Sequence, residues 1–356
     1  MPPNVYVKNG LRHVEPYMRR ITAVARPRWV GKPFLEVLAT DFRGRDIGRF
    51  SELIDSGDMY VWRRTPAGVE TVRGAQLRTE KLRRGDRISN SIHQHEKPVI
   101  AAPIDVLHED SEMLVVNKPA GVPVHSTSGY LQNTVLEILK REHGQSQLHL
   151  LYRLDKAVSG VLIMAKNLAK FKQLREEIDD KKRVHKEYVA RVRGRFPGSA
   201  ACHDNVVVVD PLKKYQYGGV GAPKRATTNF SLLEYNSELD ESTVKCVLQT
   251  GRKHQIRIHL RNLGHPIVND PLYGPSGVLG APMTSRPSSK EFSLIQEKAE
   301  QLLSAISLPG KCEVCGFPNH VDPTPEELVI YLHARKYMVQ GSWSYCAPDP
   351  GWAKFP

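Results

Sequence analysis

The stretch of residues 148–165 constrains the fold more than any other part of the sequence. Leucines lead into it, a polar break follows, and residues 161–165 read Val-Leu-Ile-Met-Ala. Apolar runs on both sides of a short polar segment are typical of two buried strands. Ser159 and Gly160 supply the turn residues that end the break. We therefore expect a buried strand, a polar break and a second buried strand.

The polar break holds an arginine and an acid, Arg153 and Asp155. In extended geometry, residues two apart leave the same side of the backbone. Because an unpaired carboxylate is costly to bury, this pair at the mouth of a buried strand indicates either a functional site or a structural ion pair. The stretch alone leaves both interpretations open.

The charge of the chain points to a polyanionic partner. Its 356 residues include 51 lysines and arginines against 38 aspartates and glutamates, a formal net charge of +13. Nucleic acid is favoured over a membrane, because no basic amphipathic helix with a bulky apolar face stands out. No apolar run approaches the ~18 residues of a membrane span. Charge alone does not separate a nucleic-acid enzyme from a passive binder.

The five cysteines, an odd number in a long chain, indicate a reducing compartment and no disulfide framework. We expect a monomer in the cytoplasm or nucleus. An organelle stays open, because residues 1–30 carry mainly basic charges. The prolines and scarce serines of that segment favour an N-terminal arm with structural contacts over a presequence.

Residues 1–98 and 99–356 are the two expected domains, divided at a proline. The first has short helical patterns at 34–38 and 50–54, then strands beginning near residues 59 and 88, so a small α+β domain is predicted. This domain is either a platform that contacts the phosphates of a nucleic acid or a cap that packs on the main domain. In the second, residues 275–325 are rich in proline, serine and glycine, which predicts an insertion with little core.

A second basic segment predicts a helix over residues 254–263, with Ile256 and Leu260 toward the core. Arg257 then lies on a buried helix, where its rigid guanidinium suits holding a carboxylate. A solvated basic face is the alternative interpretation. In the constrained loop that follows, we interpret Asp270 as a loop hydrogen bonder rather than as a second catalytic acid.

Several motifs follow one another along the chain. They are Leu114-Val-Val-Asn-Lys-Pro-Ala-Gly-Val-Pro-Val-His125, Arg153-Leu-Asp155 with Ser159-Gly160, Lys186-Glu-Tyr188, and Thr250-Gly-Arg-Lys-His-Gln-Ile-Arg257. In order, spacing and wording they resemble the RluA-type RNA pseudouridine synthases over roughly residues 104–274. That resemblance implies an α+β fold with a mixed, mostly antiparallel central sheet, flanking helices and a catalytic cleft.

The front portion resembles the eukaryotic branch of that family through Arg28-Trp-Val-Gly-Lys-Pro33 and His93-Gln-His-Glu-Lys-Pro-Val99. There it takes the place of the αL-type RNA-binding domain found ahead of many bacterial members. Two positions depart from the family pattern: Tyr152 stands where histidine is usual, and Val158 where threonine is usual. Neither is an assigned catalytic position, so the departures bear on substrate choice.

The resemblance also implies roles for single residues. Asp155 falls on the catalytic aspartate, Arg257 on its basic partner, and Tyr188 on the aromatic residue that stacks on the target base. When the target base is flipped out, it leaves a gap in the RNA helix. Arg153 resembles the family's side chain that enters this gap. By motif position we assign to substrate binding Arg153, Leu332, Lys118, His125, Thr250 and His254.

The resemblance implies neither a metal nor an organic cofactor, since the reaction involves no redox change and no hydrolysis. Cys312 and Cys315, with His320 nearby, have the spacing of half a zinc knuckle. A closed zinc site needs four ligands, and the second pair is missing, so we expect reduced thiols and no metal.

The resemblance therefore predicts an isomerase that converts a uridine to pseudouridine in structured RNA, with tRNA ahead of rRNA as substrate. The alternative is an RNA-binding protein on the same scaffold whose catalysis has faded. A zinc-dependent nucleic-acid hydrolase or deaminase is a third hypothesis, which would require stoichiometric metal.

Overall fold

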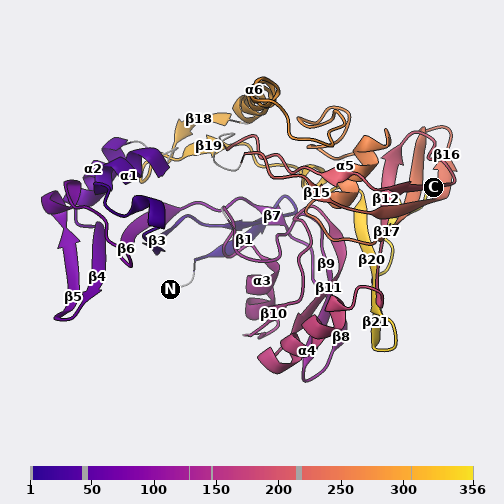
Figure 1. Ribbon diagram of the computed structural model, residues 1–356, viewed down its shortest axis with the longest axis horizontal. Coiled ribbons are helices and arrows are strands. Elements are labelled where there is room, and N and C mark those ends of the chain that lie inside the picture. Colours follow the sequence, from indigo (N-terminus) through magenta and orange to yellow (C-terminus); the bar gives the residue numbers. More distant parts are fainter. Residues whose placement is uncertain are drawn as a thin grey trace. The chain divides into compact units, whose positions relative to one another are not determined.

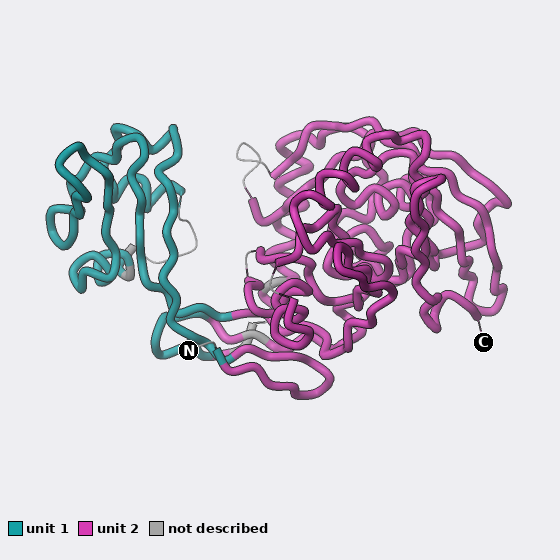
Figure 2. The backbone as a smooth tube through the Cα atoms, turned by 90° about the horizontal axis from the view of Figure 1, so that it is seen from below, with its two compact units in different colours: residues 1–3, 15–95, 310–317 teal, residues 4–14, 96–309, 318–356 magenta. Residues whose placement is uncertain are grey.

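The computed structural model describes residues 3–41, 47–127, 129–145, 147–213, 219–305 and 307–355. The backbone forms two compact units (Figure 2). Unit 1 comprises residues 1–3, 15–95 and 310–317, and unit 2 comprises residues 4–14, 96–309 and 318–356.

Unit 1 is a small α+β domain built on a four-stranded antiparallel sheet (Figure 1), with the strand order β3-β6-β4-β5. The strands are β3 (Tyr17–Val24), β4 (Met59–Thr65), β5 (Gly68–Arg73) and β6 (Arg87–Gln94). Helices α1 (Phe34–Asp41) and α2 (Ile47–Asp55) share a core with β4, in which Phe34, Ile54 and Val61 are fully buried. The predicted helices and strands of this part are confirmed.

The residue ranges that make up unit 1 differ from the expected domain of residues 1–98. The strands β1 (Val5–Lys8) and β2 (Leu11–Val14) pair with each other, and β2 also pairs with β7 (Val99–Ile100), which places residues 4–14 in unit 2. The predicted N-terminal arm with structural contacts thus consists of paired strands. Residues 310–317 join unit 1, although the chain on either side belongs to unit 2.

Unit 2 is built on a ten-stranded sheet with the path β13-β16-β17-β12-β20-β11-β9-β8, in which β10 also pairs with β11 and β21 with β20. Its strands are β8 (Asp105–Glu109), β9 (Met113–Lys118), β10 (His149–Leu150), β11 (Ser159–Ala165), β12 (Val184–Arg193), β13 (Ser199–Cys202), β16 (Thr228–Asn236), β17 (Glu241–Leu248), β20 (Leu332–Val339) and β21 (Trp343–Cys346). Strands β11 and β20 run parallel, whereas the other described pairs in the sheet are antiparallel. The mixed, mostly antiparallel sheet is confirmed.

The central strands are apolar on both faces because the sheet is covered on both sides. Along β11, Leu162 belongs to one buried cluster and Ile163 to another, as alternation along a strand requires. Helices α3 (Val135–Glu142) and α5 (Gln255–Asn262) contribute to the first cluster, and α4 (Leu168–Asp179) contributes to the second. The side chain of Thr134 caps α3, and the side chain of Asn167 caps α4.

Residues 275–325, which we expected to be an insertion with little core, include one helix and a few buried side chains. They contain α6 (Ser289–Ala305), and Phe292 and Leu279 lie in a buried cluster with Tyr273. The short strands β14 (Asn205–Val206), β15 (Lys224–Arg225), β18 (Ser307–Lys311) and β19 (Pro318–His320) complete the chain. The proline, serine and glycine residues on both sides of α6 dominate the composition of this segment. The apolar positions of the helix were therefore not recognised. Among the described helices, none has the length and apolar character to cross a membrane.

Gly160 allows the parallel strands β11 and β20 to approach each other. Its φ is +114°, and a Cβ atom there would lie 2.2 Å from the carbonyl oxygen of Ala334. We predict that Gly160→Ala lowers the free energy of unfolding by about 2–4 kcal/mol, because overpacking and an unfavourable φ combine. Urea denaturation measures the change. The control is Gly198→Ala, where the new methyl meets nothing within 4 Å; equal stability of the two variants would contradict the assignment.

Candidate active site

A cleft of about 700 Å³ opens in unit 2 where the break between β10 and β11 meets the start of α5. The predicted strand, polar break and strand are confirmed as β10, residues 151–158 and β11. The walls come from this break, from residues 251–257, from the middle of β12 and from the start of β20. The sheet therefore brings together segments that are far apart in the sequence.

Asp155 lies in the cleft wall, held by its apolar neighbours. Leu154 and Val158 are buried on either side of it, and the amide of Val158 donates to the carbonyl of Asp155 at 3.2 Å. The Asp155 side chain keeps 30% of its surface exposed. The carboxylate is thus fixed at its base and accessible from the cleft.

Arg257 lies behind Asp155 on α5, with only 8% of its side chain exposed. Its Nη1 is 3.5 Å from Oδ2 of Asp155. Its Nε and Nη2 donate to the two carboxylate oxygens of Asp270, at 2.6 and 2.8 Å. Burial opposes the charge of Arg257, but Asp270 outweighs it and holds the Arg257 pKa above its ordinary value. The alternative of a solvated basic face is wrong, since this arginine is buried between two acids.

Asp270 fixes the orientation of Arg257. Its side chain is 1% exposed, and one of its oxygens also accepts the backbone amides of Leu272 and Tyr273. Burial alone would raise the pKa of Asp270, but the hydrogen bonds and charge of Arg257 lower it below its ordinary value. Its interpretation as a loop hydrogen bonder is confirmed. The sequence had not indicated that Arg257 is the partner.

His254 directly precedes α5 and has a left-handed conformation with φ of +57°, which is rare for residues other than glycine. Its Nε2 lies 3.5 Å from Asp155 Oδ2, and its Nδ1 lies 2.9 Å from the hydroxyl of Tyr273. Burial lowers the pKa of His254 to about 4, although Asp155 acts in the opposite direction. At neutral pH the imidazole is therefore uncharged, and Arg257 provides the positive charge beside Asp155.

Tyr188 and Leu332 form the apolar side of the cleft, from β12 and β20. The pairing of these strands shifts register between Glu187 and Tyr188, which re-aims the side chains at that point. Burial raises the pKa of the Tyr188 phenol, and the nearby charge of Asp155 adds to the effect. The phenol is therefore protonated at physiological pH.

Arg153 and His125 also line the cleft. Arg153 is exposed, and its Nη1 lies 3.5 Å from His125 Nε2. Burial lowers the pKa of His125, and the charge of Arg153 acts in the same direction. Arg153 is thus a cation whose side chain is not committed to an acid in any described ion pair.

Lys118 and Thr250, both predicted to bind substrate, do not line the cleft. Lys118 is fully buried, and its ammonium donates to the carbonyls of Pro119, Val122 and Lys156 at 2.7, 2.7 and 3.1 Å. Burial lowers its pKa to about 7, against the attraction of Asp155. The hydroxyl of Thr250 donates to Gln255 and accepts the amide of Thr227. Both residues hold the loops that carry the cleft side chains.

Lys186 lines the cleft but was not among the predicted site residues. Its Nζ lies 4.8 Å from the centre of the Tyr337 ring, and burial together with the charges of Lys181 and Arg175 lowers its pKa. The sequence did contain a signal for this residue, since Lys186 opens the Lys-Glu-Tyr motif.

Tyr152 is one of the two positions that depart from the family pattern. Its ring packs against Tyr337, and its hydroxyl donates to the carbonyl of Val161.

A family model described as RNA pseudouridylate synthase matches residues 112–262. Human pseudouridylate synthase RPUSD2 is 31% identical over 98% of this chain and 74% of its own length. The tRNA pseudouridine(31) synthase of Saccharomyces cerevisiae is 32% identical over 98% of this chain and 97% of its own. The mitochondrial tRNA pseudouridine(32) synthase of that yeast is 31% identical over 98% of this chain and 78% of its own. The chain therefore belongs to the RluA-type RNA pseudouridine synthases, isomerases that convert uridine in RNA to pseudouridine.

Proposed function

We propose that the protein isomerises a uridine of tRNA, with Asp155 as the catalytic carboxylate. Two relatives that align along nearly the whole chain are tRNA pseudouridine synthases by name. The formal net charge of +13 suits a polyanionic substrate. One of these relatives is mitochondrial by name, so an organelle stays among our predictions beside the cytoplasm and nucleus.

The reaction requires a charged group beside the ribose. The bond from N1 of the base to C1′ breaks, the base turns, a bond from C5 to C1′ forms, and the proton lost from C5 is balanced by one gained at N1. A carboxylate at C1′ can act as a nucleophile, or as a base and electrostatic stabiliser. The observation that carries the proposal is the partly exposed carboxylate of Asp155, 3.5 Å from the buried guanidinium of Arg257.

The surroundings of Asp155 suit a flipped nucleotide. The cleft of about 700 Å³ lies within the range of sites that enclose small ligands. Tyr188 offers an aromatic surface for the base, and exposed Arg153 is available to fill the gap left in the RNA. Because flipping costs a few kcal/mol, a stacking partner and a filler both favour the flipped state. This complete set of side chains favours an active enzyme over a faded one.

We predict that Asp155→Asn reduces pseudouridine formation by roughly a thousandfold or more, because the amide cannot act as nucleophile or base. The Kd for tRNA should change less than about twofold, since phosphate contacts dominate affinity. Single-turnover formation of pseudouridine and filter binding measure the two quantities. A variant that retained a tenth of the wild-type rate would contradict the role given to Asp155.

We predict that Asp270→Asn slows the reaction and lowers the free energy of unfolding by about 3–5 kcal/mol, because it leaves the buried Arg257 without its strongest partner. The pKa of Asp270 is lowered in the folded protein, so its contribution is present at neutral pH and is lost as the pH falls. The stability difference from wild type should therefore shrink in acid. Denaturant titrations at several pH values measure it.

The control for this prediction is Asp105→Asn, which removes an exposed acid of β8. It should leave both rate and stability unchanged. If Asp270→Asn had the full rate at saturating RNA, Asp270 would not position Arg257 for the chemistry.

We predict that α4 is part of the RNA-binding surface. Lys172 and Arg175 are exposed on it, and the charge of Arg175 reaches Lys186 in the cleft wall. The double variant Lys172→Ala, Arg175→Ala should weaken tRNA binding and flatten the plot of log K against log salt by about 1–2. The rate at which bound tRNA is converted to its pseudouridine product should stay the same. Lys290→Ala, on α6, is the control; equal salt slopes for the wild type and the double variant would exclude α4.

A further inference from the structure

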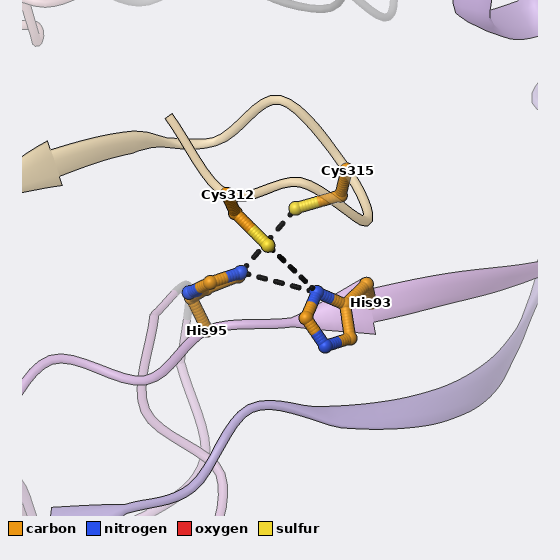
Figure 3. A group of neighbouring side chains, drawn as sticks. All are labelled: His93, His95, Cys312 and Cys315. Atoms are coloured by element: carbon orange, nitrogen blue, oxygen red, sulfur yellow. Dashed lines mark hydrogen bonds between the residues drawn. The ribbon is translucent and has the colours of Figure 1, made fainter. Parts of the chain in front are cut away.

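We propose that His93, His95, Cys312 and Cys315 bind one zinc ion in unit 1. These four side chains come from two parts of the chain that both belong to this unit. Their ligand atoms all lie within 4.8 Å of one another. Figure 3 shows the two thiols and the two imidazoles directed toward a common centre. The histidines supply the second pair of ligands that the spacing of the cysteines alone did not indicate.

The histidines are placed by the end of a strand. His93 is the penultimate residue of β6, and His95 follows its end. Residues two apart in an extended chain point to the same side, which brings both imidazoles toward the cysteines. Nδ1 of His93 and Nε2 of His95 are 3.2 Å apart. The ring of Phe317 stacks on His95, with centroids 4.9 Å apart, and limits its rotation.

The cysteines lie on a tight turn that follows β18. The amide of Cys312 donates to the carbonyl of Phe317, and the amide of Gly316 donates to the carbonyl of Cys312, both at 2.8 Å. Gly316 has φ of +67°, a conformation that side chains disfavour. Backbone amides of Val314 and Cys315 point at the Cys312 sulfur. Such outer hydrogen bonds orient the sulfur ligands of a metal site.

The two sulfur-to-nitrogen distances suit tetrahedral coordination. Sγ of Cys312 is 3.4 Å from Nδ1 of His93, and Sγ of Cys315 is 3.3 Å from Nε2 of His95. Around a tetrahedral zinc ion with Zn–N bonds of about 2.0–2.1 Å and Zn–S bonds of about 2.3 Å, neighbouring ligand atoms lie about 3.3–3.8 Å apart. A metal-free cluster would need no common centre for all four atoms.

The donor set selects zinc and a structural role. Two thiolates with two imidazoles form a Cys₂His₂ set, which is typical of closed structural zinc sites, whereas magnesium and calcium prefer oxygen. Four protein ligands leave no open position for a substrate, and none of the four residues lines the cleft. Binding releases the protons of the two thiols to solvent.

The ion would join segments that are remote in the sequence. His93 and Cys312 are 219 positions apart, so the metal would attach the turn at residues 310–317 to the end of β6. Small domains with a limited core gain most from such a link. We infer that zinc holds this turn in place on unit 1 and has no part in the isomerisation.

The first test is the zinc content of the full chain, purified from zinc-supplemented cells without chelator. We expect inductively coupled plasma mass spectrometry to find one zinc ion per chain. The zinc content of Cys312→Ser should be at least tenfold lower. His95→Cys, which replaces one ligand type by another, should keep the zinc. Cys346→Ser removes an exposed cysteine outside the cluster and should also keep it, as should Asp155→Asn.

The second test applies to wild-type protein and does not depend on how a variant folds. Protein stripped of metal is titrated with Co²⁺, which should give the visible spectrum of a tetrahedral site and a sulfur-to-cobalt charge-transfer band, both displaced by one equivalent of Zn²⁺. The proposal is overturned if the stripped wild type binds neither ion stoichiometrically. It is also overturned if Cys312→Ser keeps its full zinc content, or if Cys312 and Cys315 are isolated as a disulfide under reducing conditions.

Discussion

The guanidinium of Arg257 lies between two carboxylates, and the active site depends on this arrangement. The bidentate pair with Asp270 fixes the guanidinium in a buried position, and the remaining nitrogen reaches Asp155 at 3.5 Å. A buried charge is stable only when it is paired. The two acids beside Arg257 therefore have different roles. Asp270 satisfies the arginine within the protein, while Asp155 retains exposed surface for a substrate.

The sheet of unit 2 supplies the rigid frame for this arrangement. The parallel pairing of β11 and β20 is possible because Gly160 has no side chain, and it brings Leu332 into the cleft that Asp155 lines. The hydroxyl of Ser159 and Nδ1 of His333, 2.8 Å apart, add a contact between the same strands. Lys118 holds the carbonyl of Lys156, the neighbour of Asp155, from within the core. Buried polar contacts thus position a reactive group that stays accessible.

The sequence predicted those features that local pattern determines. The two buried strands beside the polar break and the helix that carries Arg257 follow from apolar runs and periodicity. Local pattern did not predict which residues meet across the fold, and only the family resemblance indicated that Arg257 approaches Asp155. The pairing of Asp270 with Arg257, the burial of Lys118 and the approach of His93 to Cys312 arise from tertiary contacts, which single-sequence patterns do not encode. Helix α6 was missed because loop-forming residues surround it.

The most direct test of the account is a structure of the enzyme with its tRNA bound and the target nucleotide flipped into the cleft. We predict that a carboxylate oxygen of Asp155 lies in contact with C1′ of the target ribose, at roughly 3–3.5 Å. The base should stack on Tyr188, and Arg257 should still bridge Asp155 and Asp270. A bound uridine whose ribose lies out of reach of Asp155, or a carboxylate turned away into solvent, would contradict the central claim.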